Sequence, residues 1–331
     1  MSKLRTSIRN HPLTWYYAIS VGLVILLIPP LIASSGTLGA ALEEASIPFN
    51  TDLVTALRLV IAVPAALFGV IIALLQVAAP DLAVLIVAKL GLGDGVLKDL
   101  KRRFRFWRGV SWRRGLTIWL SVVLLFCLMN LATAGLNSLV FSESDFRWGI
   151  DFFSLQFALG LLVAMFLDAG GLFEENGWRG FALPRLQARY GALVGTIILG
   201  ALWAGWHMPV KIDLALSFGW GHFLGIFAVL AIKFILISVI ITYFWNLLGQ
   251  TTLIAIVMHG LSNDSVRLGG ELLGDSLRLN YLSEVNLIVP MLVVSVVLLI
   301  ISKGRLGQPT SEVRELGPEA GRPILHPSRE N

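Results

Sequence analysis

Two adjacent glutamates and an arginine interrupt an otherwise apolar part of the chain, GGLFEENGWRGFAL at residues 170–183. Glu175 and Arg179 lie four positions apart, so on a helix they share a face and can form an ion pair. Glu174 points about 100° away on the same helix and lacks that partner. A carboxylate in an apolar setting with no cation beside it is suited to act as a general base. We therefore assign the chemical role to Glu174 and a positioning role to Arg179, through its pairing with Glu175.

Two further residue pairs share helical faces later in the chain. Trp203 and His207 are four positions apart, and so are His259 and Asn263. Ionisable groups within membrane segments are functional candidates by default. The simpler explanation for each is an ion pair or a hydrogen bond that locks helices together.

A turn at residues 188–191 sets the relative depth of the first glutamate and the first of these histidines. Gly191 is typical of the residue that ends a helix. If the helices on either side run antiparallel, Glu174 and His207 reach the same height, because each lies a similar number of residues from the turn. Such a carboxylate and imidazole could hold a water molecule between them. The hairpin requires a sharp break at Gly170–Gly171, or a tilted and partly protruding helix.

Other polar residues have simpler interpretations. His222 opens an apolar segment and is interpreted as an interfacial histidine, and Asn246 as a residue that hydrogen-bonds between helices. The sequence GLGD at 91–94 has the Gly-x-Gly-Asp form of intramembrane aspartyl proteases. Because Asp94 lies beside a basic loop, we interpret it as the N-cap of a helix instead.

The composition is that of a membrane protein. Hydrophobic residues make up 56% of the chain and charged residues 14%, with a mean hydropathy of +0.78, whereas soluble domains carry roughly 25% charge. The single cysteine, Cys127, excludes a disulfide within the chain. The net charge of +5 does not indicate nucleic acid, because the basic residues cluster between apolar segments.

The apolar segments predict an all-α polytopic protein with about eight transmembrane helices, given roughly 20 apolar residues per crossing. The predicted spans are 14–34, 53–79, 115–137, 148–170, 192–210, 222–248, 251–263 and 286–302. The seventh span is short and is expected to extend toward residue 270. The shorter run at 81–92 fits an interfacial or re-entrant helix.

The loops predict the orientation and the division into domains. The N-terminus is basic, and segment 98–114 holds eight basic residues against one acidic residue, whereas the loops that follow the first and third spans are acidic. By the positive-inside rule, both termini face the cytoplasm. We expect an integral protein of a bacterial plasma membrane. It would have N-terminal helices with a basic loop over 1–147, a catalytic core over 148–302 and a polar, disordered tail over 303–331.

Three segments closely resemble the motifs of a known family. They are EENGWRGFALPRLQ (174–187), LWAGWHMP (202–209) and TYFWNLLGQTTLIAIVMHGLSN (242–263). These segments are similar to the motifs of the CPBP family, the CAAX-protease and bacteriocin-processing group of intramembrane proteases, also called Abi. The family pattern is a Glu-Glu-x-x-x-Arg block, an aromatic-x-x-x-His block and a His-x-x-x-Asn block. The one departure is Trp203, where phenylalanine is more usual, and an aromatic wall should survive that exchange.

The resemblance implies a catalytic set of five residues with two supporting ones. The catalytic set is Glu174, Glu175, His207, His259 and Asn263, and the supporting residues are Arg179 and Trp203. In the family mechanism, Glu174 and His207 would activate a water molecule that attacks the scissile carbonyl. His259 and Asn263 would donate hydrogen bonds to the developing oxyanion, and Glu175 and Arg179 would hold the motif helix in place.

Metal dependence is left open at this point. Glu174, His207 and His259 form a set that resembles a catalytic zinc site. Against zinc, no His-Glu-x-x-His motif occurs, and water activation by a glutamate and a histidine requires no ion. We expect no essential cofactor, with a divalent metal such as zinc as the alternative.

The sequence therefore predicts a CAAX-type intramembrane endopeptidase, either glutamate-dependent or a metalloprotease. It would hydrolyse a peptide bond in a membrane-associated or prenylated protein or peptide, with the substrate and the lipid bilayer as partners and no nucleic acid. One alternative is a non-catalytic bacteriocin-immunity or scaffold protein. Another is a transporter with an embedded proton relay, which would be expected to show inverted repeats that the sequence lacks.

Overall fold

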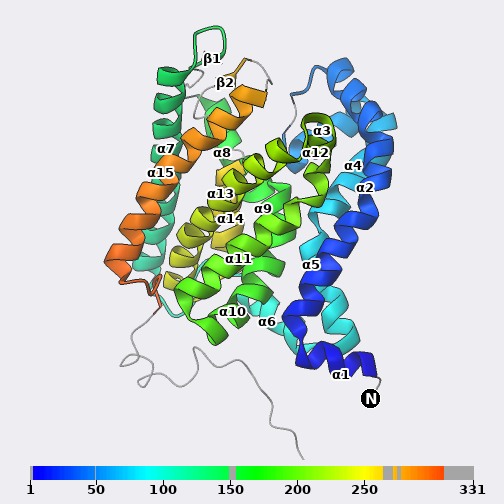
Figure 1. Cartoon of the computed structure of the whole chain (residues 1–331). Coiled ribbons are helices and arrows are strands. Elements are labelled where there is room, and N and C mark those ends of the chain that lie inside the picture. The colour runs from blue at the N-terminus through cyan, green and yellow to red at the C-terminus, as the bar shows by residue number, and fades with distance from the viewer. Residues whose placement is uncertain (1–2, 49, 149–153, 264–270, 274–276, 309–331) are drawn as a thin grey trace, which may run out of the picture.

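The computed structural model describes residues 3–48, 50–148, 154–263, 271–273 and 277–308 and confirms the all-α class (Figure 1). A single two-residue antiparallel pair joins β1 (Phe146–Arg147) and β2 (Glu271–Leu272). The α-helices are α1 (Lys3–Asn10), α2 (Pro12–Ala45), α3 (Leu53–Ala62), α4 (Leu67–Val77), α5 (Ala79–Val87), α6 (Gly95–Arg103), α7 (Trp112–Val140), α8 (Leu155–Leu167), α9 (Ala169–Glu175), α10 (Leu183–Tyr190), α11 (Ala192–His207), α12 (Ile212–Phe218), α13 (Trp220–Leu247), α14 (Thr252–Asn263) and α15 (Leu277–Ser302).

Within the part of the chain that the structure describes, four helices are long and apolar enough to cross a membrane, namely α2, α7, α13 and the Tyr281–Ser302 part of α15. Two bent pairs raise the number to six if each pair counts as one span: Pro64–Val77 with Ala79–Leu92, and Ala192–His207 with Pro209–Phe218. The polytopic class is therefore confirmed, but eight complete spans are not found among the described residues. Helices α3, α8 and α14 have 10, 13 and 12 residues, fewer than the roughly 20 that one crossing needs.

Two of the spans predicted from the sequence are interrupted at a proline. The predicted span 53–79 is interrupted at Pro64, which begins a 3-10 turn, because proline has no amide hydrogen and cannot continue the helical ladder. The predicted span 192–210 likewise ends as a helix before Pro209. Residues 81–92 lie in a segment that meets the preceding one at 59°, which agrees with a re-entrant helix.

The helix that carries the glutamates begins at a sharp break in the chain. The break lies at Asp168, between α8 and α9, and not at Gly170–Gly171 as predicted. Asp168 has extended backbone angles, and its Oδ1 accepts a hydrogen bond from the amide of Gly171 at 2.6 Å. An aspartate in this N-cap position satisfies an amide that the helix leaves unpaired, which explains why a new helix starts there.

The predicted hairpin around Gly191 is present. After α9 the chain continues through a π-helical segment, Asn176–Ala182, into α10, which ends at Gly191 with φ +80°. The helix α11 then returns beside this segment, and Trp203 contacts Glu174 across the hairpin. The comparison of the heights of Glu174 and His207 assumed that the helices on either side of this turn run antiparallel, and the structure shows that arrangement.

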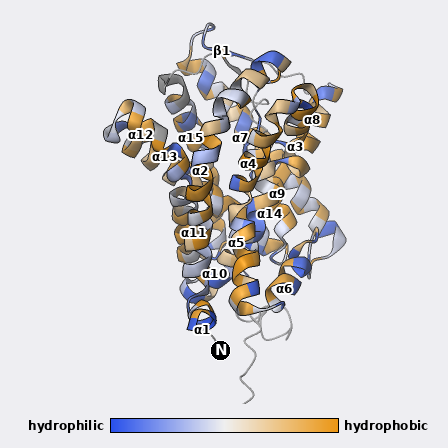
Figure 2. Cartoon of the chain, turned by 90° about the vertical axis from the view of Figure 1, so that its right-hand side faces the viewer, coloured by the Kyte–Doolittle hydropathy of each residue, from blue (hydrophilic) through white to orange (hydrophobic). Residues whose placement is uncertain are grey.

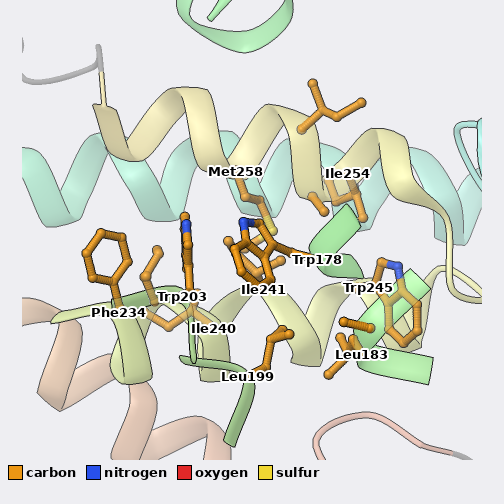
Figure 3. Close-up of a cluster of buried hydrophobic side chains, with 14 of the residues drawn as sticks. Trp178, Leu183, Leu199, Trp203, Phe234, Ile240, Ile241, Trp245, Ile254 and Met258 are labelled. Atoms are coloured by element: carbon orange, nitrogen blue, oxygen red, sulfur yellow. The ribbon is translucent and has the colours of Figure 1, made fainter. Parts of the chain in front are cut away.

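The core of the molecule is dominated by tryptophans. Figure 3 shows Trp178, Trp203 and Trp245 packed among aliphatic side chains of α13 and α14. Outside this core, large apolar side chains are exposed, among them Leu26 at 70% and Ile61 at 71%. Apolar residues dominate the helices through the middle of the molecule (Figure 2). This distribution suits a protein whose outer surface contacts lipid.

The tail that follows α15 begins with a packed segment. The side-chain amide of Asn246 donates to the carbonyl of Leu306 at 2.8 Å, and Gln308 donates to Gln187 at 2.8 Å. Residues 309–331 lie outside the described residues, as does the predicted extension of the seventh span toward residue 270.

Candidate functional site

The structure confirms the ion pair between Glu175 and Arg179 and extends it. The Oε1 atom of Glu175 accepts from Arg179 Nη1 at 2.6 Å and lies 2.8 Å from His259 Nδ1. Arg179 is fully buried, donates through Nη2 to the Ser238 hydroxyl at 3.1 Å and lies 4.4 Å over the Trp203 ring. Glu175 thus joins the first motif to the third, a connection that helical spacing does not reveal.

Glu174 is buried but is held by neutral donors. Its Oε2 atom accepts hydrogen bonds from the indole nitrogens of Trp203 at 2.9 Å and of Trp178 at 3.2 Å. These two indole donors were not predicted. The tryptophan at 203 matters here, because a phenylalanine ring would form the same wall without an N–H group to donate.

The tautomer of His207 follows from its hydrogen bond. The Nδ1 atom lies 2.8 Å from the Trp203 carbonyl oxygen, and because a carbonyl can only accept, Nδ1 carries the proton. The ring stacks on Phe234 with centroids 4.4 Å apart. In the neutral imidazole, Nε2 then presents its lone pair, as required of a group that orients or accepts a proton from water.

His259 and Asn263 lie one turn apart on α14, beside the start of α9. The Nδ1 atom of His259 faces the Glu175 carboxylate, so it carries the proton. The Asn263 amide donates to Asp168 at 3.3 and 3.4 Å, and Asp168 also accepts from the Thr51 hydroxyl at 2.8 Å. Asp168 therefore holds the asparagine of the third motif, and nothing in the sequence pattern singled it out.

Gly170 allows the third motif to approach α9. A Cβ atom at this position would lie 2.6 Å from His259 Nε2 and 3.1 Å from Asn263 Nδ2. A contact below 3.0 Å requires one of the atoms to move, so a side chain at residue 170 would displace the His259 ring and crowd the Asn263 amide. The close packing of α9 on α14 therefore depends on the first glycine of the GGLFEE sequence.

We expect Gly170→Ala to reduce the rate of the reaction that this site performs by about 10²-fold, because a misplacement of about 1 Å can cost that much. Alanine is favoured over glycine within a helix, so the folded protein should persist. The measurement is the turnover of purified, folded protein. Gly160→Ala in α8, where a Cβ atom meets nothing within 4 Å, is the matched control and should leave turnover unchanged.

These side chains face a cavity of about 620 Å³. The functional residues that line it are Gly170, Glu174, Trp203, His207, His259 and Asn263. The walls also include residues from the first half of the chain, such as Leu38, Thr51 and Val70. The N-terminal helices are therefore part of the cavity, although their sequence showed only generic apolar spans.

A buried aspartate of the N-terminal half supports the glutamate helix. Asp81 in α5 accepts hydrogen bonds from Asn176 Nδ2 and from the Gly177 amide, both at 2.7 Å. These bonds tie the first turn of the π-helical segment to α5. The sequence pattern gave Asp81 no role in this site.

The structure leaves the zinc site considered from the sequence unconfirmed. Within the described residues, no group of three or more His, Cys, Asp or Glu side chains is arranged to hold a metal ion. Glu174 directs Oε2 to two indole donors, and both histidines use Nδ1 for other partners. Hydrogen bonds at Nδ1 leave Nε2 of each histidine accessible to a ligand, and no step is assigned to a metal.

The residues given simpler interpretations lie away from the site. His222 is exposed at the start of α13, and Asn246 bonds to Leu306. Asp94 takes the N-cap position of α6, although its side chain makes no capping hydrogen bond.

Comparison with known proteins agrees with the geometry. A family model described as type II CAAX prenyl endopeptidase Rce1-like matches residues 156–264, the region that holds all seven residues of the site. This match supports a likeness of this region to the CPBP family of CAAX-type proteases. The protein named CAAX prenyl protease 2 of Methanococcus maripaludis is 29% identical over 153 residues, which are 43% of this chain and 51% of that protein. The chain thus spans about half the length of this CPBP relative.

Proposed function

We propose that the protein is an intramembrane endopeptidase in which Glu174 and His207 activate a water molecule. The observation that carries this proposal is the placement of Glu174 on a cavity wall with Oε2 held by two indoles. This leaves Oε1 to meet a water in the cavity. The match of residues 156–264 to the Rce1-like family model and the similarity to CAAX prenyl protease 2 support the same reaction class.

The proposed reaction is a hydrolysis without a covalent intermediate. Glu174 accepts a proton as the water oxygen attacks the carbonyl carbon of the scissile peptide bond, with the lone pair of His207 Nε2 orienting the water. The C–N bond then breaks, and the proton held by Glu174 passes to the leaving nitrogen. The proton of the new carboxylic acid passes to the amine, so the products are a carboxylate and an ammonium group and no oxidant or other co-reactant is consumed.

The third motif supplies the donors for the tetrahedral intermediate. The Asn263 amide and Nε2 of a protonated His259 would donate to the oxyanion, an interaction often worth about 3–4 kcal/mol. The Glu175 carboxylate at His259 Nδ1 stabilises the positive ring that such donation requires. The positions of Gly170 and Asp168 beside these two groups support this assignment.

We propose as substrate a peptide or protein segment at the membrane. The name of the Methanococcus maripaludis relative refers to prenylated CAAX proteins, and this chain would accept a membrane-associated segment with or without a prenyl group. The lipid bilayer is the other expected partner, and a plasma membrane the expected location.

We expect Asn263→Ala to lower kcat by about 10²- to 10³-fold, as the loss of one oxyanion donor does in other hydrolases. The measurement compares new peptide termini by mass spectrometry in proteoliposomes that contain membrane proteins as candidate substrates. Asn246→Ala is the matched control, because Asn246 bonds to Leu306 outside the cavity, and it should keep the wild-type rate. A wild-type protein that produces no new termini would instead favour the immunity or scaffold alternative.

A further inference from the structure

The two ends of the molecule differ in charge. In Figure 1, α1, α6 and α10 lie at one end, and α3, α12 and the β1–β2 pair lie at the other. The first end carries most of the basic residues: Lys3, Arg5, Arg9, Lys98, Lys101, Arg102, Arg103, Arg105, Arg108, Arg113, Arg114, Arg185, Arg189, Lys303 and Arg305. We call this the basic end.

Hydrogen bonds independently place the basic residues 98–114 at the turn between α13 and α14. Arg103 Nη1 donates to Gln250 Oε1 at 3.0 Å, and the Arg108 amide donates to the Leu248 carbonyl at 3.0 Å. Arg9 reaches the Gly91 carbonyl at 3.0 Å. The basic residues near these helix ends thus form one face, which the positive-inside rule assigns to the cytoplasm.

The opposite end is rich in acidic residues. Glu43 and Glu44 end α2, Asp52 caps α3, and Glu143 and Asp145 follow α7. Basic residues are sparse here, with Arg58 and Arg147 among them. The helices α2 and α7 both begin at the basic end and finish at the acidic end. The acidic end therefore lies on the non-cytoplasmic side.

The cavity belongs to the non-cytoplasmic half. It is lined by Leu38 and Leu42 near the end of α2, by the α2–α3 loop residues from Asn50, and by the first half of α15 from Ser283 to Met291. Within the described part of the chain, no residue of α1, α6, α7 or α10 lines it. Between Glu174 and the basic end, the chain runs from residue 175 to 190, which spans roughly 20 Å at 1.5 Å per helical residue.

We infer that the cavity opens to the non-cytoplasmic side, so that the substrate is a peptide segment exposed there. The assignment of a peptide substrate rests on the proposed function, whereas the direction of opening does not. Leucines 38, 42, 59 and 74 on the wall suit a segment with apolar side chains, such as the end of a transmembrane helix.

Thiol labelling tests the direction of opening without any need for cleavage. Cys127 is the only cysteine, so Cys127→Ala gives a cysteine-free background. Three single cysteines are then compared: Glu43→Cys at the acidic end, Ser283→Cys on the cavity wall and Lys98→Cys at the basic end. Intact cells are treated with a membrane-impermeant maleimide before and after permeabilisation.

We expect full labelling of Glu43→Cys and Ser283→Cys in intact cells, and labelling of Lys98→Cys only after permeabilisation. Labelling of Lys98→Cys alone in intact cells would overturn the orientation. Labelling of Glu43→Cys with protection of Ser283→Cys until permeabilisation would overturn the direction of opening.

The substrate class is tested separately by mapping the new termini of membrane proteins. Cleavage sites that depend on the wild-type protein should lie in non-cytoplasmic segments, and sites in cytoplasmic segments would contradict the inference. If the labelling result holds but no cleavage site exists, the sidedness stands and the proposed protease function fails.

Discussion

Replacing Glu174 with glutamine is expected to reduce kcat by about 10²- to 10⁴-fold, the range that a general base contributes. Glutamine is isosteric and keeps an oxygen that can accept from the Trp178 and Trp203 indoles, so the fold and the wall of the cavity should remain. It cannot take a proton from water. Because the interaction is made in the transition state, KM should change little while kcat falls.

The matched control for this variant is Glu284→Gln. Glu284 also lines the cavity, and its carboxylate accepts from Lys233 Nζ at 2.7 and 2.9 Å. The pair is partly exposed, with 20% and 36% of the two side chains accessible, so its loss should change stability by less than about 1 kcal/mol. We expect this variant to retain cleavage. Wild-type cleavage by Glu174→Gln would contradict the assignment of Glu174 as the base.

Replacing Arg179 with methionine is expected to lower the free energy of unfolding by about 3–5 kcal/mol, the cost of removing one partner of a buried ion pair. Both side chains of the Glu175–Arg179 pair are fully buried, 2.6 Å apart. Without the guanidinium, the Glu175 carboxylate stays buried, and of its two ion-pair partners the His259 ring is left. Chemical unfolding of the purified protein in detergent measures the loss.

The double variant Glu175→Met with Arg179→Met separates stability from chemistry. Replacing both partners of a buried pair with apolar residues of similar size is often neutral, so the double variant should regain most of the stability lost in Arg179→Met. Cleavage should stay low, because His259 Nδ1 loses its acceptor. A double variant as unstable as the single one would show that the loss does not arise from an uncompensated carboxylate.

The contacts that the sequence predicted correctly are local or follow from a single turn. Spacing of four residues placed Arg179 beside Glu175. The turn at Gly191 predicted an antiparallel hairpin with Glu174 level with His207, and the contact observed across it joins Glu174 to Trp203, one turn before His207. Both arguments use only the geometry of one helix or one hairpin. The family motifs then joined residues from three helices into one site.

The missed contacts join residues that are far apart in the chain. Glu175 and His259 are 84 positions apart, and Asp168 and Thr51 are 117 apart, so no periodic pattern connects them. The indole donors to Glu174 were missed because the sequence analysis treated Trp203 only as an aromatic surface of the site and not as a hydrogen-bond donor. Eight complete spans are not found among the described residues, and apolar composition did not reveal the break at Asp168, where a bond to Gly171 caps a new helix.

The most direct test of a water activated by Glu174 is the origin of the oxygen in the new C-termini. Wild type and Glu174→Gln are reconstituted with membrane proteins from cells that lack this chain, in water enriched in ¹⁸O, and the termini are identified by mass spectrometry. We expect wild type to produce C-termini carrying one ¹⁸O atom and Glu174→Gln to produce almost none. Equal numbers of labelled termini from both proteins, or none above background from wild type, would contradict the account.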